Sequence, residues 1–535
     1  MDSADDLPLT IPGLLRARAD ELGDAPFVVC DAARISYREA ERRSARLARA
    51  LVAAGVGKGS HVGLLLPNGT AFLTAWLAAA RGGAVAVPLS TFSRPAELAV
   101  LLRNADVEVL LSARSYRSHD YERTLAAGVD ALDLATAGPL ESPTAPVLRH
   151  VFFDAPSAGV HRDWSLEALL ERADRIGEDV LAALERDVQP ADRMIIVHTS
   201  GSTSEPKGVV HAHGPLIRHL DNLNEIRRYT RDEILFASAP WFWIGGFAYA
   251  LLGTLVAGAR LVCSNAADAA VVLDLLERER PTLVNGFAQS VEHLARDPSF
   301  PRRDLSSIRR GNLYPILPAA VRPKDPGLRH GMLGMTETGS VCLVSPDEAD
   351  LPEAQRGSFG RPAPGFEARV VDPESGQPCA PGATGELWLR GPFLMEGYYG
   401  RERWEVFDAD GWFHTGDLFH VDAGGLFYFH GRCGDLIKTA GANVSPREVE
   451  AVLAEVAGLR AHVVGLDDAE RGQRVAAALV SGAPVDLDAL LRRLGERLSS
   501  YKIPRTFVVL SEAEIPMMSS GKLDLRALKA LFDGR

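Results

Sequence analysis

A run of hydroxyl, glycine and lysine residues, HTSGSTSEPKG at 198–208, combines groups that bind a polyphosphate. Glycines let the backbone approach an anion closely, Pro206 stiffens the exit, and Lys207 supplies a compact positive charge. The run follows apolar residues 194–197 and precedes two valines at 209–210, so we expect a strand, a loop and a second strand. It has neither the Gly-Lys-Ser/Thr sequence nor the following helix of the common nucleotide loop. Taken alone, the run could equally be a surface turn.

Two later segments supply oxygen ligands suited to the same anion. The segment MLGMTETG (332–339) offers Thr336 to a phosphate oxygen and Glu337 to Mg²⁺, which prefers carboxylate ligands. The segment GWFHTGDL (411–418) places Asp417 on a turn, where one carboxylate can accept both hydroxyls of a ribose. These groups predict a nucleotide site.

Two segments near the carboxyl end add positive charge. The segment GRCGDLIKTAGANVSPREVE (431–450) places Arg432 beside glycine-rich backbone. The segment PMMSSGKLDLRAL (516–528) holds Lys522 on a Ser/Gly loop before a short helix. Cations at these positions would offset the charge of a nucleotide that reacts with an anionic substrate.

The composition is that of an ordinary globular enzyme, with 46% hydrophobic and 24% charged residues. The net charge of -12 argues against broad nucleic-acid binding. Five cysteines without a Cys-x-x-Cys pair indicate reduced thiols in a cytoplasmic protein, and His211 and His213 lack a third ligand for zinc. The acidic N-terminus does not have the pattern of a signal peptide.

Hydrophobic patterning predicts several structural units in the 535 residues. Residues 61–112 alternate strand, helix and strand, and residues 194–285 repeat the alternation, which predicts parallel sheets flanked by helices. Short β-branched and aromatic runs between 360 and 430 predict an antiparallel sheet or a small barrel. Mixed α/β sequence after Gly434 predicts a separate small domain.

Residues 234–259 are uncharged and long enough to cross a membrane. Pro240 and four glycines interrupt this stretch, and ordinary α/β sequence flanks it. A buried helix or the wall of a pocket is therefore expected, and the protein is not expected to be an integral membrane protein.

In their order along the chain, these five motifs resemble those of the adenylate-forming superfamily, which contains acyl-CoA synthetases, aryl-CoA ligases, firefly-type luciferases and adenylation domains. The family's loop pattern, Thr-Ser-Gly-Ser/Thr-Thr-Gly-x-Pro-Lys-Gly, is matched except that Ser204 replaces the second glycine. The resemblance covers nearly the whole chain. It implies an α/β fold with a large N-terminal domain, residues 1–433, of two βα sheet units plus a small β-barrel. A small, mobile α+β C-terminal domain, residues 434–535, follows and carries Lys522.

The resemblance also implies roles for the matching residues. Lys522 would bridge the acyl carboxylate and the α-phosphate, Thr336 would contact the α-phosphate, and Glu337 would bind Mg²⁺. Asp417 and Arg432 would hold the ribose. The β- and γ-phosphates would be bound by Thr199, Ser200, Gly201, Ser202, Thr203, Ser204 and Lys207.

Three positions concern the hinge, coenzyme A and adenine. Gly434 stands where the family has its hinge residue, usually Asp or Lys, so rotation should be easy but less well defined. Gly441 is assigned to coenzyme A. Leu333 stands where relatives carry the ring that packs on adenine, and Tyr314 is one candidate to replace that ring.

The resemblance places the acyl pocket at PWFWIGGFAYA (240–250), which is aromatic and apolar. This segment has no carboxylate to hold an amino acid's ammonium group, so an uncharged acyl tail is favoured. Aromatic clusters of this kind also occur as plain core. The expected lining is Trp241, Trp243, Gly245, Phe247 and Leu333.

The sequence thus predicts an ATP-dependent carboxylic acid:CoA ligase that uses ATP, Mg²⁺ and coenzyme A and forms an acyl-AMP intermediate. Its substrate would be an aliphatic or aromatic acid. An acyl-AMP ligase that loads a separate carrier protein is the first alternative, and a luciferase-like oxygenase is another. A non-catalytic protein for apolar ligands would explain residues 234–259 but not the presence of Glu337 and Lys522.

Overall fold

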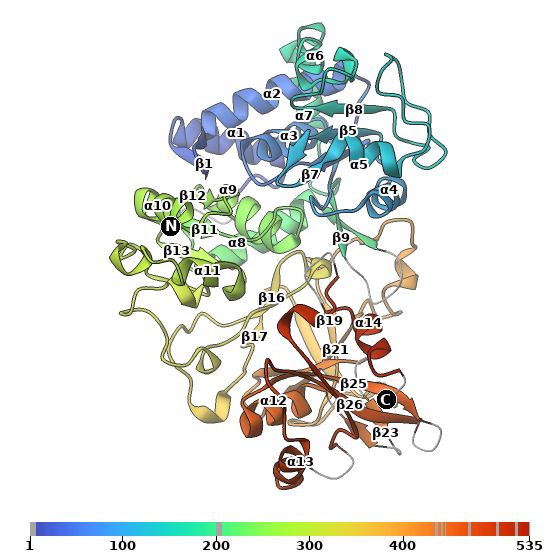
Figure 1. The fold of residues 1–535 in the computed structure, drawn as a ribbon. Coiled ribbons are helices and arrows are strands. Elements are labelled where there is room, and N and C mark those ends of the chain that lie inside the picture. The colour runs from blue at the N-terminus through green and yellow to red at the C-terminus, as the bar shows by residue number, and fades with distance from the viewer. Residues whose placement is uncertain are drawn as a thin grey trace. The chain divides into compact units, whose positions relative to one another are not determined.

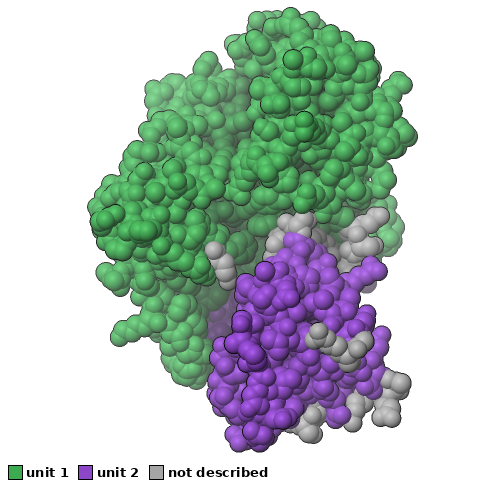
Figure 2. Space-filling model, viewed as in Figure 1, with its two compact units in different colours: residues 1–356, 362–366, 391–408 green, residues 357–361, 367–390, 409–535 purple. Residues whose placement is uncertain are grey.

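The computed structural model divides into two compact units, green and purple in Figure 2. Unit 1 comprises residues 1–356, 362–366 and 391–408, and unit 2 comprises residues 357–361, 367–390 and 409–535. The structure describes residues 7–199, 206–433, 437–439, 442–444, 446–468, 472–498, 502–518 and 523–533. The predicted domain boundary after residue 433 stays a prediction.

Unit 1 contains two sheets, as the alternation of strands and helices predicts. The first has the order β20-β10-β9-β4-β3-β5-β8. Its strands are β3 (His61–Leu65), β4 (Val85–Pro88), β5 (Val109–Ser112), β8 (His150–Phe153), β9 (Arg193–Thr199), β10 (Lys207–Ala212) and β20 (Gly397–Tyr398). Strand β10 is antiparallel to both its neighbours, and the other pairs are parallel. Helices α3 (Thr70–Arg81) and α4 (Pro95–Asn104) make the predicted crossovers.

The second sheet has the order β14-β13-β11-β12-β1-β2. Its strands are β1 (Pro26–Cys30), β2 (Ala33–Ser36), β11 (Ile234–Ala237), β12 (Arg260–Cys263), β13 (Leu283–Asn285) and β14 (Arg310–Gly311). All pairs are parallel except that of β1 with β2, so β2 forms an antiparallel edge. In Figure 1 the central strands of this sheet lie among α8 (His213–Ile226) and α10 (Ala269–Glu279).

The long uncharged stretch 234–259 is divided between a strand and two short helices. After β11, a π-helix spans Gly245–Leu252 and α9 spans Gly253–Ala257. Most side chains of the two helices are buried, so the expected buried helix is confirmed. No helix in the described part of the chain has both the length and the apolar character needed to cross a bilayer.

Unit 2 contains a four-stranded antiparallel sheet in the region where the sequence predicts an antiparallel sheet or a small barrel. Its order is β18-β19-β21-β22. The strands are β18 (Glu367–Val371), β19 (Gly385–Arg390), β21 (Phe413–Val421) and β22 (Phe427–Arg432).

The rest of unit 2 is a five-stranded sheet with helices on both faces. Its strands are β23 (Ile437–Thr439), β24 (Ala442–Val444), β25 (Arg460–Asp468), β26 (Gly472–Val480) and β27 (Thr506–Leu510). Ala477 and Leu479 pack with α12 (Pro446–Ala457) and α13 (Leu487–Gly495), and Ala476 and Ala478 pack with α14 (Leu525–Ala530). This alternation is the two-residue period of a sheet that is covered on both sides.

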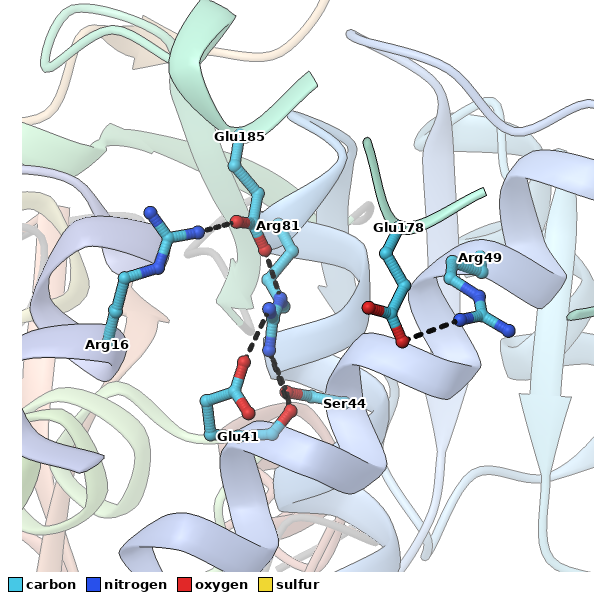
Figure 3. Close-up of polar contacts among 7 residues, drawn as sticks. All are labelled: Arg16, Glu41, Ser44, Arg49, Arg81, Glu178 and Glu185. Atoms are coloured by element: carbon cyan, nitrogen blue, oxygen red, sulfur yellow. Dashed lines mark hydrogen bonds and ion pairs between the residues drawn. The ribbon is translucent and has the colours of Figure 1, made fainter. Parts of the chain in front are cut away.

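A buried ion network joins four helices that cover the N-terminal part of unit 1 (Figure 3). Arg81 of α3 pairs with Glu185 of α7 (Glu178–Asp187), and their side chains are 5% and 3% exposed. Arg81 also donates to Glu41 at 2.8 Å and to Ser44 Oγ at 3.0 Å, both on α2 (Tyr37–Ala53). Arg16 of α1 (Ile11–Leu22) pairs with Glu185 as well. The guanidinium of Arg81 thus has two carboxylates and a hydroxyl oxygen as partners.

We expect Glu185→Gln to lower the free energy of unfolding of unit 1 by about 3 kcal/mol, because the buried Arg81 guanidinium loses the more deeply buried of its two carboxylate partners. Urea denaturation would measure this loss. Glu178→Gln is the matched control on the same helix: Glu178 pairs with Arg49 but its side chain is 90% exposed, so its loss should cost less than about 1 kcal/mol. Equal losses in the two variants would contradict the account.

Candidate active site

The run predicted to bind phosphate lies between two paired strands of unit 1. Strand β9 ends at Thr199 and β10 begins at Lys207, and these residues are direct partners in the antiparallel register. The two predicted strands are confirmed, and the sheet holds the two ends of the run together. The contacts predicted for Ser200, Gly201, Ser202, Thr203 and Ser204 lie outside the described residues.

Tyr398 connects the lysine of this run to the predicted magnesium ligand. Its hydroxyl donates to Glu337 Oε1 at 2.9 Å, and Lys207 Nζ lies 4.9 Å from the centre of its ring. Pairing of Val209 with Tyr398 fixes β20 beside β10, and the Met395 N–H donates to the Glu337 carbonyl at 2.8 Å. The structure therefore brings a cation and a carboxylate to one tyrosine. Tyr398 was not predicted from the sequence, because a tyrosine in GYYG carries no chemical signature of its own.

Thr336 and Glu337 begin a single 3₁₀ turn, Thr336–Thr338, whose backbone is fixed from two sides. The His211 ring contacts the first residue of the turn, because its Nε2 lies 2.7 Å from the Thr336 carbonyl oxygen. The turn ends at Gly339, which has φ +69°, and a Cβ there would lie 2.6 Å from the Leu216 side chain. Only glycine fits this position without strain. The turn therefore presents the Thr336 and Glu337 side chains from a fixed backbone.

Glu337 has the donor set expected for Mg²⁺. Its Oε1 accepts from Tyr398, and Oε2 has no hydrogen-bond partner among the described residues. No group of three or more His, Cys, Asp or Glu side chains in the described part of the chain could hold a metal ion. Mg²⁺ does not need such a group, because one or two carboxylates, water and substrate phosphates usually complete its shell.

The predicted ribose ligands, Asp417 and Arg432, pair with each other within unit 2. They are partners across β21 and β22, and Arg432 Nε lies 2.9 Å from Asp417 Oδ1. The prediction that Asp417 lies on a turn is wrong, because it lies inside β21. Gly416, the residue before Asp417, has φ +72°, and the ladder to β19 continues past it with a register shift, while the ladder to β22 includes Asp417 itself.

Two of the five residues predicted to line the acyl pocket are packed in the core. Trp241 and Phe247 are fully buried. Trp241 lies edge-on to Phe72, with ring centres 5.5 Å apart, and Phe247 lies edge-on to Trp76 at 4.9 Å. Packing accounts for both side chains, and their role in the pocket stays a prediction.

The other three predicted pocket residues are accessible. Trp243 is partly exposed and meets Phe287 at a right angle with ring centres 6.0 Å apart, and the Phe287 side chain is 59% exposed. Gly245 is exposed at the start of the π-helix, and Leu333 is half-buried in β15 (Leu333–Gly334). Trp243 and Phe287 follow the carboxyl ends of β11 and β13 along the chain.

Three histidines near the site are buried and neutral. His219 lies against Phe366 and Phe393, with ring centres 5.0 and 5.6 Å apart, and burial lowers its pKa to about 3. Burial also lowers the pKa of His211 and of His213 to about 4. His211 and His213 contact backbone groups: His211 supports the turn that carries Thr336, and His213 Nδ1 accepts from the Ile11 N–H at 3.2 Å.

We expect these histidines to make the protein unstable in acid. In the unfolded chain each takes up a proton near its ordinary pKa of 6.5, whereas the folded state resists protonation down to about pH 4. Stability is therefore lost as the pH falls from about 6.5 to 4, by roughly 3 kcal/mol per histidine. Urea unfolding at pH 7 and pH 5 measures this change, and equal free energies of unfolding at the two pH values would contradict it.

The predicted roles of Gly434, Gly441 and Lys522 concern positions outside the described residues. The short helix predicted after Lys522 is confirmed. Strand β23 follows Gly434 and the short helix α14 follows Lys522.

Two family models match the chain. Residues 15–399 match the model described as AMP-binding enzyme, and residues 448–522 match the model described as AMP-binding enzyme C-terminal domain. The chain is 33% identical to a feruloyl-CoA synthase of an Amycolatopsis species, over 91% of this chain and 92% of that protein. It is 32% identical to an indoleacetate–CoA ligase of Aromatoleum aromaticum, over 93% of each chain.

Solved structures with the same fold cover nearly the whole chain. ATP-bound MatB from Rhodopseudomonas palustris has a TM-score of 0.80 and 25% identity, over 98% of this chain and 99% of that one. The anthranilate CoA ligase AuaEII in complex with anthranoyl-AMP has a TM-score of 0.79 over 99% of both chains. Its identity is 23%, so this likeness concerns the fold.

Proposed function

The chain belongs to the AMP-binding enzyme family. From this membership we propose which residues bind the substrates and which act in each step of an acid–CoA ligase reaction. The enzyme joins a carboxylic acid to coenzyme A through an acyl-AMP intermediate and consumes ATP. The observation that carries the assignment of residues is the convergence of Lys207 and Glu337 on Tyr398. A cation beside a carboxylate is the arrangement that a magnesium-bound polyphosphate requires.

In the first half-reaction, a carboxylate oxygen of the acid attacks the α-phosphorus of ATP, and pyrophosphate leaves with the electrons of the broken P–O bond. Lys207 neutralises the departing phosphates, and Lys522 lies between the carboxylate and the α-phosphate. Thr336 binds an α-phosphate oxygen, and Glu337 holds Mg²⁺. When bound, Mg²⁺ reduces the repulsion between the two anions.

In the second half-reaction, the thiolate of coenzyme A attacks the acyl carbon and AMP leaves with the bridging oxygen. The thiol proton passes to solvent, and because a free thiol ionises at pH ~8.5, only a modest lowering of its pKa is needed to form the thiolate near neutral pH. We assign Lys522 to the mobile C-terminal domain, which withdraws it after the first step by rotation at Gly434. Asp417 and Arg432 hold the ribose, and Gly441 borders coenzyme A.

The acid itself is a small-molecule carboxylic acid with an uncharged tail. Support comes from the uncharged segment 234–259 and from relatives named for ferulate and indoleacetate. We place the enzyme in the cytoplasm because its five cysteines are free thiols. A carrier-protein thiol in place of coenzyme A is the second candidate acceptor.

Pyrophosphate release with a panel of carboxylic acids, with and without coenzyme A, tests the proposal. We expect slow, acid-dependent release without coenzyme A, because acyl-AMP stays bound, and rapid turnover to AMP and acyl-CoA with it. Acid-dependent release that coenzyme A does not accelerate would favour the carrier-protein acceptor. No acid-dependent release with any member of the panel would refute the proposed function.

A further inference from the structure

A cavity of about 350 Å³ lies in unit 1 beside the edge strand of the second sheet. Leu283 and Val284 of β13 form part of its wall, and Gly311 of β14 exposes bare backbone to it. Gly311 has φ +136°, and a Cβ there would lie 2.0 Å from the Val284 carbonyl oxygen, so no larger residue fits. The volume is within the range of about 300–1,000 Å³ usual for small-molecule pockets.

The cavity borders the elements that carry the proposed reaction. Asn285 and Asn312 line it at the carboxyl ends of β13 and β14, where open α/β sheets bind ligands. Met332 lines it four residues before Thr336 on the same segment. Tyr249 enters the lining from the π-helix that begins at Gly245. A substrate whose carboxylate reacts beside Thr336 can therefore place its tail here.

Three of the four arginines in the cavity wall form ion pairs within the protein. Arg309 and Arg310 pair with Glu233 at 2.8 and 3.4 Å, and Arg329 pairs with Asp350 at 2.7 Å. These ion pairs occupy the guanidinium groups that could bind a second carboxylate on the substrate.

The fourth arginine of the wall is held by aromatic rings. The Arg227 guanidinium lies 4.1 Å from the Tyr249 ring centre and 4.5 Å from that of Tyr229, and it donates to Asn224 and to the Tyr249 carbonyl. This cation therefore orients the two tyrosine rings. The tyrosine rings of the wall favour a flat tail.

Two tyrosine hydroxyls in the wall are available to a ligand. The hydroxyls of Tyr249 and Tyr314 have no hydrogen-bond partner among the described residues. Burial raises the pKa of Tyr314, so its hydroxyl keeps its proton and can donate. The Tyr229 hydroxyl differs, because it lies 2.7 Å from Thr254 Oγ1 and is engaged inside the protein.

We propose that this cavity receives the ring of an aromatic acid that carries a hydroxyl group, and that Tyr249 and Tyr314 bind this hydroxyl. The inference rests on the proposed function and names its substrate class. Aromatic rings gain from edge-on contact with tyrosine rings, and a rigid ring loses less freedom on binding than a flexible chain does. A cavity with two free hydroxyls is occupied best by a ligand that satisfies them.

The test compares four acids of similar length by kcat/KM for pyrophosphate release in the presence of coenzyme A. They are 3-(4-hydroxyphenyl)propanoate, 3-phenylpropanoate, 3-cyclohexylpropanoate and heptanedioate. We expect that order of preference, with the ring hydroxyl improving kcat/KM by about tenfold. A preference for the saturated ring or for the dicarboxylate would overturn the inference while leaving the ligase function intact. Failure of every acid, including aliphatic ones, would remove the function and the inference together.

Variants locate the effect in the cavity. In the double variant Tyr249→Phe/Tyr314→Phe, the ratio of kcat/KM between the hydroxylated and unhydroxylated phenyl acids should fall to within about twofold of one. Tyr229→Phe is the matched control, because it removes a hydroxyl that faces Thr254, and it should retain the ratio. An unchanged ratio in the double variant, or an equal fall in the control, would overturn the assignment. A merely structural effect would lower both activities and leave their ratio in place.

Discussion

Lys522→Ala is expected to lower acid-dependent ATP–pyrophosphate exchange by about 10²- to 10³-fold while supplied acyl-AMP is still converted to acyl-CoA. The lysine is needed only while the carboxylate and the α-phosphate, both anionic, approach each other. The thioester step has no such repulsion, because the mixed anhydride is already formed. Measuring the two half-reactions separately therefore separates this role from general loss of the fold.

Lys529→Ala is the control for this variant. Lys529 is an exposed cation in α14, seven residues beyond Lys522 in the same part of the chain. Its removal should leave both half-reactions near the wild-type rate. Exchange at the wild-type rate in Lys522→Ala would refute the proposed role, and equal loss of both half-reactions would mean that the lysine acts on the fold.

Glu337→Gln is expected to lower pyrophosphate exchange by about 10²- to 10³-fold, because the neutral amide is a poor ligand for Mg²⁺. Tyr398→Phe keeps the ring under Lys207 but removes the hydrogen bond that orients the carboxylate. We expect it to raise the Mg²⁺ concentration for half-maximal exchange by about tenfold. Equilibrium binding of ATP can be measured with and without Mg²⁺ in the absence of turnover. In both variants Mg²⁺ should strengthen ATP binding less than it does in the wild type.

The neighbouring tyrosine provides the matched control. The Tyr399 hydroxyl donates to Asp106 at 2.7 Å, away from Glu337. Tyr399→Phe should therefore keep the wild-type dependence on Mg²⁺. If Tyr398→Phe and Tyr399→Phe behaved alike, the hydrogen bond to Glu337 would have no part in holding the metal.

The strands and helices that short apolar runs specify could be predicted from the sequence. The alternation in residues 61–112 yields β3, α3, β4, α4 and β5, because each element buries a continuous apolar run. The strands on either side of the phosphate run follow for the same reason. The turn predicted for Asp417 is wrong because the pairing of β21 with β19 and β22, which the segment 411–418 alone does not reveal, decides the structure there.

The rest of the site depends on contacts between distant segments. Tyr398 lies 61 residues from Glu337 in sequence, and the pairing of β20 with β10 brings them together. The aromatic segment 240–250 shows no difference in sequence between Trp241, which the core buries, and Tyr249, which borders the cavity. Such a distinction depends on how each side chain packs in the folded protein, which the pattern of an uncharged aromatic segment does not specify.

Transfer of oxygen from the acid to AMP tests the central claim most directly. The acid is supplied with ¹⁸O in both carboxylate positions, and the products of one turnover with ATP and coenzyme A are analysed by mass spectrometry. An acyl-AMP intermediate predicts one ¹⁸O atom in AMP and one in the thioester carbonyl, with none in pyrophosphate. AMP without ¹⁸O, or label in inorganic phosphate, would contradict it.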